Sequence, residues 1–340
     1  MERKYSLKRF LSIQGMKPAL AAFAVLIVIY LTFGIIDTSV FSSANIMNLL
    51  RSMSIYLLIG IGQSFVLITG NIDLSIGSTV GLSAMISAAL MEHGGISPPY
   101  TVLITICCSL LVGLMNGTMV SKLKLPPHIA TLGMMFIARG VAYMISRNRC
   151  ADTISLGIGK EAADRFQDFF YYGKTWGIFN AFLISIAIFA VFFFLLSKTK
   201  TGRHMYSVGS NIDAAKLAGV NVQATITRAY LVSAFCACVV GIILCAQSGM
   251  GNMEAGNMYE MYGVAAAVIG GISTFGGSGI LLGTFAGAAV WQTLQNGLSM
   301  VGAQVGIQRI VIGVVVMIAV LLDIVLRDGK RTRHNSHRIS

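Results

Sequence analysis

The sequence has few charged residues. Asp, Glu, Lys and Arg make up 11% of its 340 residues, whereas hydrophobic residues make up 55%, and the mean hydropathy is +0.76. Soluble domains carry about 25% charged residues, because a surface that faces water needs them. The same composition excludes intrinsic disorder, collagen and small disulfide scaffolds. The sequence therefore predicts an integral membrane protein.

Signatures of nucleotide, metal and disulfide chemistry are also missing. The Gly-rich run 270–279 lacks the Lys-Ser/Thr that completes a phosphate-binding loop, and the G-K-T sequence ending at Thr175 has Asp168 where that motif needs its first glycine. The five histidines show no metal-ligand spacing. Five of the six cysteines lie in apolar runs, and only Cys150 lies in a polar loop. We expect a protein that is not an enzyme and that binds no cofactor or metal itself.

Apolar runs dominate the rest of the chain. A helix needs roughly 20 mostly apolar residues to cross a bilayer core, and the eighth run here is too short unless it begins near Met258 or is re-entrant. We predict an all-α, polytopic membrane protein with about ten transmembrane helices between residues 18 and 326. The runs are Pro18–Ile36, Ser54–Thr69, Leu74–Met91, Tyr100–Met119, Ile129–Ile145, Ile178–Leu196, Ala229–Ala246, Ala265–Phe275, Ile280–Met300 and Ile310–Val325.

Basic residues outnumber acidic ones by 25 to 13, which in a soluble protein would suggest nucleic acid. Here they cluster beside the apolar runs, so the positive-inside bias explains them and no nucleic-acid partner is expected. With a cytoplasmic N-terminus, 17 of the 25 fall inside and six outside. The inner clusters are the tails 1–17 and 327–340, the pair Lys122 and Lys124, and the loop 198–228. We therefore expect both termini in the cytoplasm and an external loop at 147–176.

The inner loop contains a short helical pattern. Ser210, with Asp213 three residues later, has the spacing of a capping box. Three alanines follow between 214 and 218, and Gly219 can end the helix in a left-handed conformation. A helix of two turns is marginal alone in water, so the protein or a partner must hold it. The residues alone leave two alternatives, an interfacial helix between spans or a docking element.

Polar side chains interrupt the apolar runs. Asn71 and Asp73 lie in the break before the third run, where an ionisable residue faces protein or a wet cavity. Asp73 either caps the following helix or lines a pathway, and the two roles are compatible. Arg139 lies within the fifth run, where it pairs, with Asp73 as one candidate, or contacts substrate.

Five further polar residues have two readings. Each either faces a lumen or joins two helices by a hydrogen bond. The Gly283-x-x-x-Gly287 pattern indicates close helix packing rather than binding. The five residues are Gln63, Asn116, Gln292, Gln295 and Asn296.

Four motifs in order resemble those of a known family. Asp213-Ala214-Ala215-x-x-x-Gly219 resembles the coupling signature of permeases in ABC (ATP-binding cassette) importers. The wider pattern from Gly209, which includes Asn211, looks like the version in ribose-type sugar permeases. Segments 70–78, 126–140 and 268–279 also resemble that family, and the resemblance runs roughly from Asn45 to Asp323. Asn71, His128 and Tyr262 depart from its usual residues.

This resemblance implies a pore subunit in a bacterial inner membrane that imports a small sugar-like solute. ATP and Mg would be bound by a separate ATPase subunit. A second permease copy or a homologous permease and an extracytoplasmic solute-binding protein would complete the transporter. The helix would couple to the ATPase through Ser210, Asn211, Asp213, Ala214, Ala215 and Gly219, with Ala215 on a thin face that enters a partner's cleft. The pathway or gate would involve Gln63, Asn71, Asp73, Asn116, Arg139, Gln292 and Asn296.

Two other functions compete with this one. A secondary transporter driven by an ion gradient would carry several carboxylates inside the membrane, and Asp73 is the one credible candidate in the first nine runs. A channel or a purely structural membrane subunit would leave the short inner helix without a role.

Overall fold

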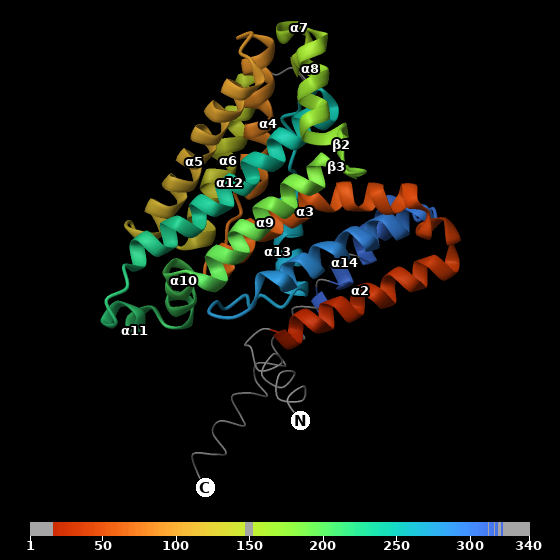
Figure 1. Ribbon diagram of the computed structural model, residues 1–340. Helices are drawn as coiled ribbons and strands as arrows, with labels where there is room; N and C mark the ends of the chain where they lie inside the picture. The colour runs from red at the N-terminus through yellow and green to blue at the C-terminus, as the bar shows by residue number, and fades with distance from the viewer. Residues whose placement is uncertain (1–15, 147–151, 312, 316, 319–320, 322–340) are drawn as a thin grey trace.

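The computed structural model describes residues 16–146 and 152–311, together with 313–315, 317, 318 and 321. Helices make up most of this part of the chain, and the predicted all-α class is confirmed (Figure 1). The helices are α2 (Met16–Ile36), α3 (Ser43–Ile68), α4 (Ile76–Glu92), α5 (Pro98–Ser121), α6 (Pro127–Ile145), α7 (Ile154–Ile158), α8 (Lys160–Gln167), α9 (Asn180–Lys198), α10 (Lys200–Ser210), α11 (Ile212–Leu217), α12 (Val222–Ser248), α13 (Tyr259–Ile269) and α14 (Leu281–Met300), with short helical turns η1 (Thr38–Phe41) and η2 (Asp168–Tyr172).

Six of these helices are long and apolar enough to cross a membrane: α2, α3, α5, α6, α9 and α12. The predicted count of about ten is therefore not confirmed. Helix α4, with 17 residues, and α13, with 11, are shorter, and α14 is not among the six. Half of the tenth predicted run lies outside the described residues, and its described half is helical.

Helix α3 begins eleven residues before the predicted run Ser54–Thr69. Its N-cap is Ser42, whose side chain accepts a hydrogen bond from the Asn45 amide at 3.2 Å. The added turns carry Asn48 and Arg51, so the apolar pattern did not include them. Polar N-terminal turns of a helix are invisible to a search for apolar runs.

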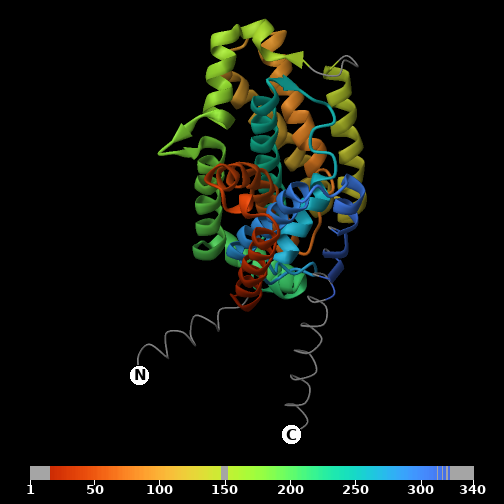
Figure 2. The same cartoon turned by 90° about the vertical axis from the view of Figure 1, so that its right-hand side faces the viewer.

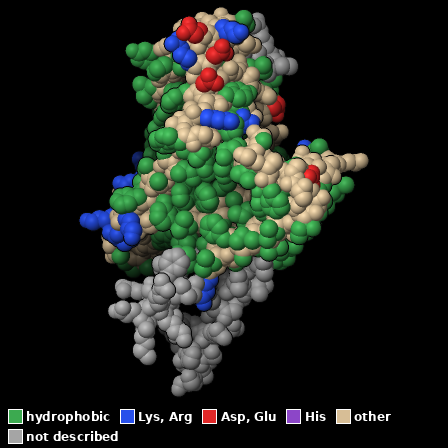
Figure 3. All heavy atoms as spheres, turned by 45° about the vertical axis from the view of Figure 1, so that its right-hand side comes forward, with side chains coloured by type: hydrophobic (Ala, Val, Ile, Leu, Met, Phe, Trp, Pro, Cys, Tyr) green, Lys and Arg blue, Asp and Glu red, His purple; other side chains and the backbone are tan. Residues whose placement is uncertain are grey.

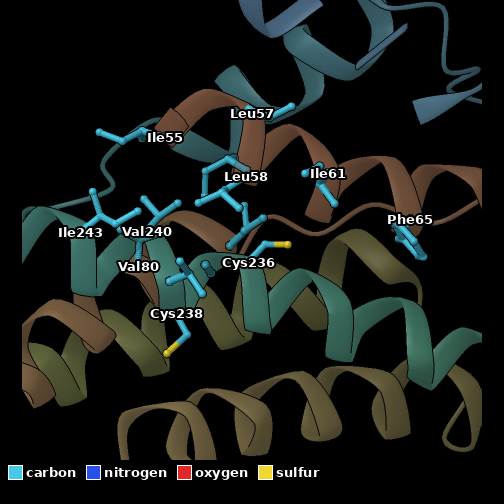
Figure 4. Close-up of a cluster of buried hydrophobic side chains, with 14 of the residues drawn as sticks. Ile55, Leu57, Leu58, Ile61, Phe65, Val80, Cys236, Cys238, Val240 and Ile243 are labelled. Carbon is cyan, nitrogen blue, oxygen red and sulfur yellow. The ribbon is translucent and has the colours of Figure 1, made fainter. Parts of the chain in front are cut away.

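Helices α3, α4 and α12 form the centre of the molecule (Figures 1 and 2). Most residues of α3 and α12 are buried, whereas few residues of α2 and α9 are. Figure 4 shows Leu58 of α3 on the side that faces Val240 and Ile243 of α12, with Val80 of α4 in the same cluster. Apolar side chains on the outer helices form a broad green belt in Figure 3, as expected for a surface that meets lipid.

Polar segments lie at the two ends of this belt. At the upper end in Figure 1, β1 (Asp152–Thr153) pairs antiparallel with β4 (Met250–Gly251), and β2 (Lys174–Thr175) with β3 (Ile178–Phe179). Helices α7 and α8 lie between these strands in sequence, and acidic and basic side chains gather at this end in Figure 3. At the opposite end lie α10 and α11.

The basic clusters divide between these ends as the charge pattern predicts. Near Lys122, the Ser121 hydroxyl lies 3.3 Å from that of Thr227, so this cluster adjoins the loop 198–228. Arg51 lies at the other end, with its guanidinium carbon 4.3 Å from the ring centroid of Phe179. Which end faces the cytoplasm stays a prediction, and both terminal tails lie outside the described residues.

Candidate functional site

The short helix α11 is present, but its cap differs from the predicted one. Asn211 is the N-cap, and its side-chain oxygen accepts a hydrogen bond from the Ala214 amide at 2.9 Å. The predicted capping pair of Ser210 with Asp213 is wrong, because Ser210 is the last residue of α10. Gly219 adopts the predicted left-handed conformation, with φ of +79°, directly after the C-cap Ala218.

The face of α11 that was expected to meet a partner points inward. Ala215 is 1% exposed and belongs to the main hydrophobic cluster, so its placement on an outer, partner-facing surface is corrected. Asp213 and Ala214 are exposed. The most exposed apolar side chain is Leu217, at 91%, followed by Ile212, at 51%. An apolar side chain this exposed on a short helix is available for docking.

Helix α10 joins α11 to two breaks in the membrane helices. The Gly277 amide donates to the Ile68 carbonyl at the end of α3, at 2.9 Å. The Ser210 hydroxyl donates to the Gly277 carbonyl at 3.5 Å. A Cβ on Gly276 would lie 2.8 Å from the backbone of Gly70, and one on Gly209 would overlap the Ile68 carbonyl. Glycines therefore allow the backbone of α10 to touch the two breaks.

The break between α3 and α4 is built around the carboxylate of Asp73, which is 2% exposed. One oxygen accepts from the Ser75 amide at 2.9 Å and from the Ser75 hydroxyl at 2.7 Å. The other accepts from the Ser233 hydroxyl of α12 at 2.7 Å. The N-cap of α4 is Ser75 itself, so the predicted capping by Asp73 takes the form of a turn just before the helix.

Two buried amides surround this carboxylate turn. The Gln63 side chain donates to the Asp73 carbonyl at 2.5 Å, and the Asn116 side chain of α5 donates to the Ser75 hydroxyl at 2.7 Å. Tyr230 donates from its hydroxyl to the Ile72 carbonyl at 3.0 Å. Three helices, α3, α5 and α12, thus fix one irregular turn, and this satisfies polar backbone that lipid could not.

Arg139 does not pair with Asp73, so that candidate ion pair is corrected. Its guanidinium donates to the carbonyl of Met253 and, at 2.9 Å, to that of Ala255. Both carbonyls belong to the segment between β4 and α13. Asp73 already has its two serine partners, which leaves no need for a cation beside it.

The other predicted polar residues are dispersed. Asn71 donates to the Thr69 hydroxyl at 2.9 Å, within its own break. Gln292 is buried on α14, and Asn296 donates to the Asn45 side chain at 3.0 Å. Gln295 accepts from the Tyr56 hydroxyl at 2.8 Å. The helix-to-helix reading therefore holds for Gln295 and Asn296.

The glycine pattern on α14 does what its spacing predicts. A Cβ on Gly283 would overlap the carbonyl of Gly270, and one on Gly287 would overlap that of Ala266. Helices α13 and α14 therefore pack backbone to backbone.

Sequence reasoning missed Ser75, Ser233 and Tyr230. Ser75 lies inside the Gly70–Ser78 motif, two residues after Asp73, so this motif could have indicated it. Ser233 and Tyr230 lie in an otherwise apolar helix 160 and 158 residues from their partners. No local pattern distinguishes a serine that bonds across helices from one that bonds to its own helix.

Comparisons with known proteins agree with this architecture. The family model described as the branched-chain amino acid transport system / permease component matches residues 45–321. The ribose import permease protein of Bacillus subtilis (strain 168) is 31% identical over 309 residues, which cover 91% of this chain and 94% of that protein. The fructose import permease protein of Rhizobium meliloti is 32% identical over 310 residues, covering 90% and 85%. The ribose import permease protein of Escherichia coli (strain K12) is 32% identical over 323 residues, covering 94% and 96%. No solved structure matches significantly.

The matched range nearly coincides with the span over which the four motifs resembled ribose-type sugar permeases. That resemblance is confirmed by relatives that cover most of the chain. The chain belongs to the family of transport-system permease components that the matching model describes.

Proposed function

We propose that this chain is the pore-forming subunit of an ATP-driven importer for a sugar or sugar-like solute. The relatives described above are named as ribose and fructose import permeases, whereas the matching family is named for branched-chain amino acids. The three relatives described above, all with sugar names and more than 30% identity, favour the sugar. As expected of a permease, the chain would leave ATP and Mg to a separate ATPase subunit.

The observation that carries this proposal is the placement of α11. It presents Leu217 and Ile212 outward, and α10 connects it through backbone contacts to the breaks after α3 and before α14. A push on α11 would therefore reach both breaks without passing through a flexible loop. A channel or a purely structural subunit has no use for this linkage, and an ion-driven transporter has no ATPase to push it.

The full transporter would hold two permeases, two ATPase subunits and a solute-binding protein outside the bacterial inner membrane. We place α10 and α11 on the cytoplasmic side, because the basic loop 198–228 contains them. The opposite end, with α7 and α8, would then face the binding protein. Both terminal tails would be cytoplasmic.

The test replaces the exposed docking side chain. We expect Leu217→Ala to weaken co-purification of the ATPase subunit and to reduce solute uptake, because an apolar contact of this size contributes about 1–3 kcal/mol when buried. Leu156→Ala, at a side chain 75% exposed on α7, is the matched control and should leave ATPase binding unchanged. Equal ATPase binding and uptake in the two variants would contradict docking through α11.

A further inference from the structure

The chain between α12 and α13 runs back along α4. It contains the two-residue strand β4 and no helix. A Cβ on Gly251 would lie 2.7 Å from that of Ala88, and one on Gly81 would lie 2.7 Å from the Ala255 carbonyl. Further along, Gly256 lies directly against Gly77. The segment thus follows α4 from Gly77 to Ala88, a distance of about 16 Å along the helix at 1.5 Å per residue.

This segment lies beside the middle of helices that are long and apolar enough to span a membrane. Arg139, which holds the Met253 and Ala255 carbonyls, lies well inside α6, a helix of 19 residues. Just past the segment, a Cβ on Gly263 would lie 3.2 Å from the carbonyl of Ile59, within α3. The segment therefore begins near the polar end, where Met253 contacts Ser146 at the end of α6, and reaches the level of the middle of α3 and the start of α4 at residues 255–261.

One face of the segment is polar and exposed. Asn252, Glu254 and Asn257 are exposed, and so are Met258 and Met261, at 50% and 53%. Irregular backbone at membrane depth, as in residues 255–258, is tolerated only against protein or a water-filled cavity. This face therefore does not meet lipid, unlike the apolar faces of α2 and α9.

Side chains of α6 hold the segment in place. The Tyr143 hydroxyl of α6 donates to the Glu254 carboxylate, and the Asn252 side chain accepts from the Glu254 amide at 2.8 Å. With Arg139 on the neighbouring carbonyls, these bonds orient the outer face. Within the described residues, no hydrogen bond is found for the side chain of Asn257, which leaves both its donor and its acceptor available to a ligand.

We propose that residues 252–261 line the water-filled solute pathway and that the Asn257 amide hydrogen-bonds the hydroxyls of the passing solute. This inference rests on the proposed function and adds to it the surface along which the solute moves. A neutral polyhydroxylated solute needs donors and acceptors on a wet wall, and an amide supplies both. Interrupted helices line the substrate sites of many transporters for the same physical reason.

The test measures access of water-soluble reagents to the segment in the assembled transporter. Asn257→Cys and Met261→Cys are made in a background in which Cys107, Cys108 and Cys150 are replaced by serine. Val191→Cys, at a side chain 63% exposed on α9, is the lipid-facing control. We expect a charged, membrane-impermeant methanethiosulfonate to modify both segment positions rapidly and the control barely. Modification should also slow uptake relative to the same untreated variant.

If both segment positions react as slowly as Val191→Cys, residues 252–261 do not line the pathway and the proposal is overturned. A second variant tests the contact with solute: Asn257→Leu should lower uptake by about two- to tenfold, the loss of one neutral hydrogen bond, at unchanged protein yield. Unchanged uptake kinetics in Asn257→Leu overturns that contact. If the unlabelled parent shows no ATP-driven uptake, the proposed function fails, whereas normal parental uptake with unreactive cysteines refutes this inference alone.

Discussion

The Asp73 carboxylate provides the sharpest test of how the membrane break is held together. Asp73→Ala removes the acceptor for three donors: the Ser75 amide at 2.9 Å, and the hydroxyls of Ser75 and Ser233, each at 2.7 Å. Hydroxyls can rotate to other acceptors, but the amide cannot. Stranding one or two buried donors costs about 1–3 kcal/mol each, so we expect a loss of about 2–5 kcal/mol.

Asp73→Asn is the matched conservative variant. Its amide oxygen can still accept from Ser75, and its amide group can donate to the Ser233 hydroxyl, so we expect a smaller loss of about 1 kcal/mol. Asp164→Ala, at an exposed position on α8, should be silent. The measurement is thermal unfolding of the purified protein in detergent, with yield in the membrane as a second readout.

The expected order of unfolding temperatures is parent and Asp164→Ala together, then Asp73→Asn, then Asp73→Ala. An Asp73→Ala protein as stable as the parent, with altered solute preference, would refute the structural role. It would show instead that this carboxylate faces the solute pathway.

Three further substitutions test other parts of the fold. Gly287→Val should reduce yield and unfolding temperature sharply, because its side chain would overlap the Ala266 carbonyl. The control is Gly313→Val, which has open space around it. Normal yield of Gly287→Val would contradict the close approach of α13 and α14. Gly219→Val should cost about 1–2 kcal/mol in the left-handed position and reduce uptake more than insertion, measured as uptake per inserted protein; equal uptake would contradict the need for this helix end. Arg51→Ala removes cation–π contacts to Tyr171 and Phe179 at 4.7 and 4.3 Å, which contribute about 1–2 kcal/mol. We expect faster tryptic cleavage within α8. Unchanged cleavage would show that these contacts do not stabilise this end of the protein.

The membrane helices follow from the sequence because apolar length is a local property. All ten predicted runs overlap helical residues, including the short α13 under the eighth run and residues 310 and 311 at the start of the tenth. The bounds differ where polar residues extend a helix, as at Ser42 before α3. The count of about ten is not confirmed, because only six of the described helices are long and apolar enough to cross a membrane.

The short helix α11 was predicted in the right place, but Ala215, which was expected on its outer face, points inward. Sequence showed a short helix ended by Gly219, and that much is confirmed. The sequence could not show that α10 continues through Ser210. Because Ser210 belongs to α10, Asn211 is the residue that caps α11. Nor could the sequence show that Ala215 packs on the protein's own core, because small residues suit a tight interface on either side.

Partners across the membrane were the least predictable. Arg139 was expected to pair with a carboxylate, since an ion pair is the usual way to satisfy a charge at depth. It binds two backbone carbonyls more than a hundred residues away instead. Those carbonyls are free to accept because residues 252–258 are not helical.

Solute uptake into proteoliposomes tests the central claim most directly. The vesicles would contain this chain with its ATPase subunit, the solute-binding protein outside, and ATP in the compartment that the ATPase faces. We predict accumulation of a labelled sugar such as ribose or fructose that requires ATP hydrolysis and that is unaffected by collapsing proton and sodium gradients. Uptake by this chain alone, driven by an ion gradient and indifferent to ATP, would contradict the account.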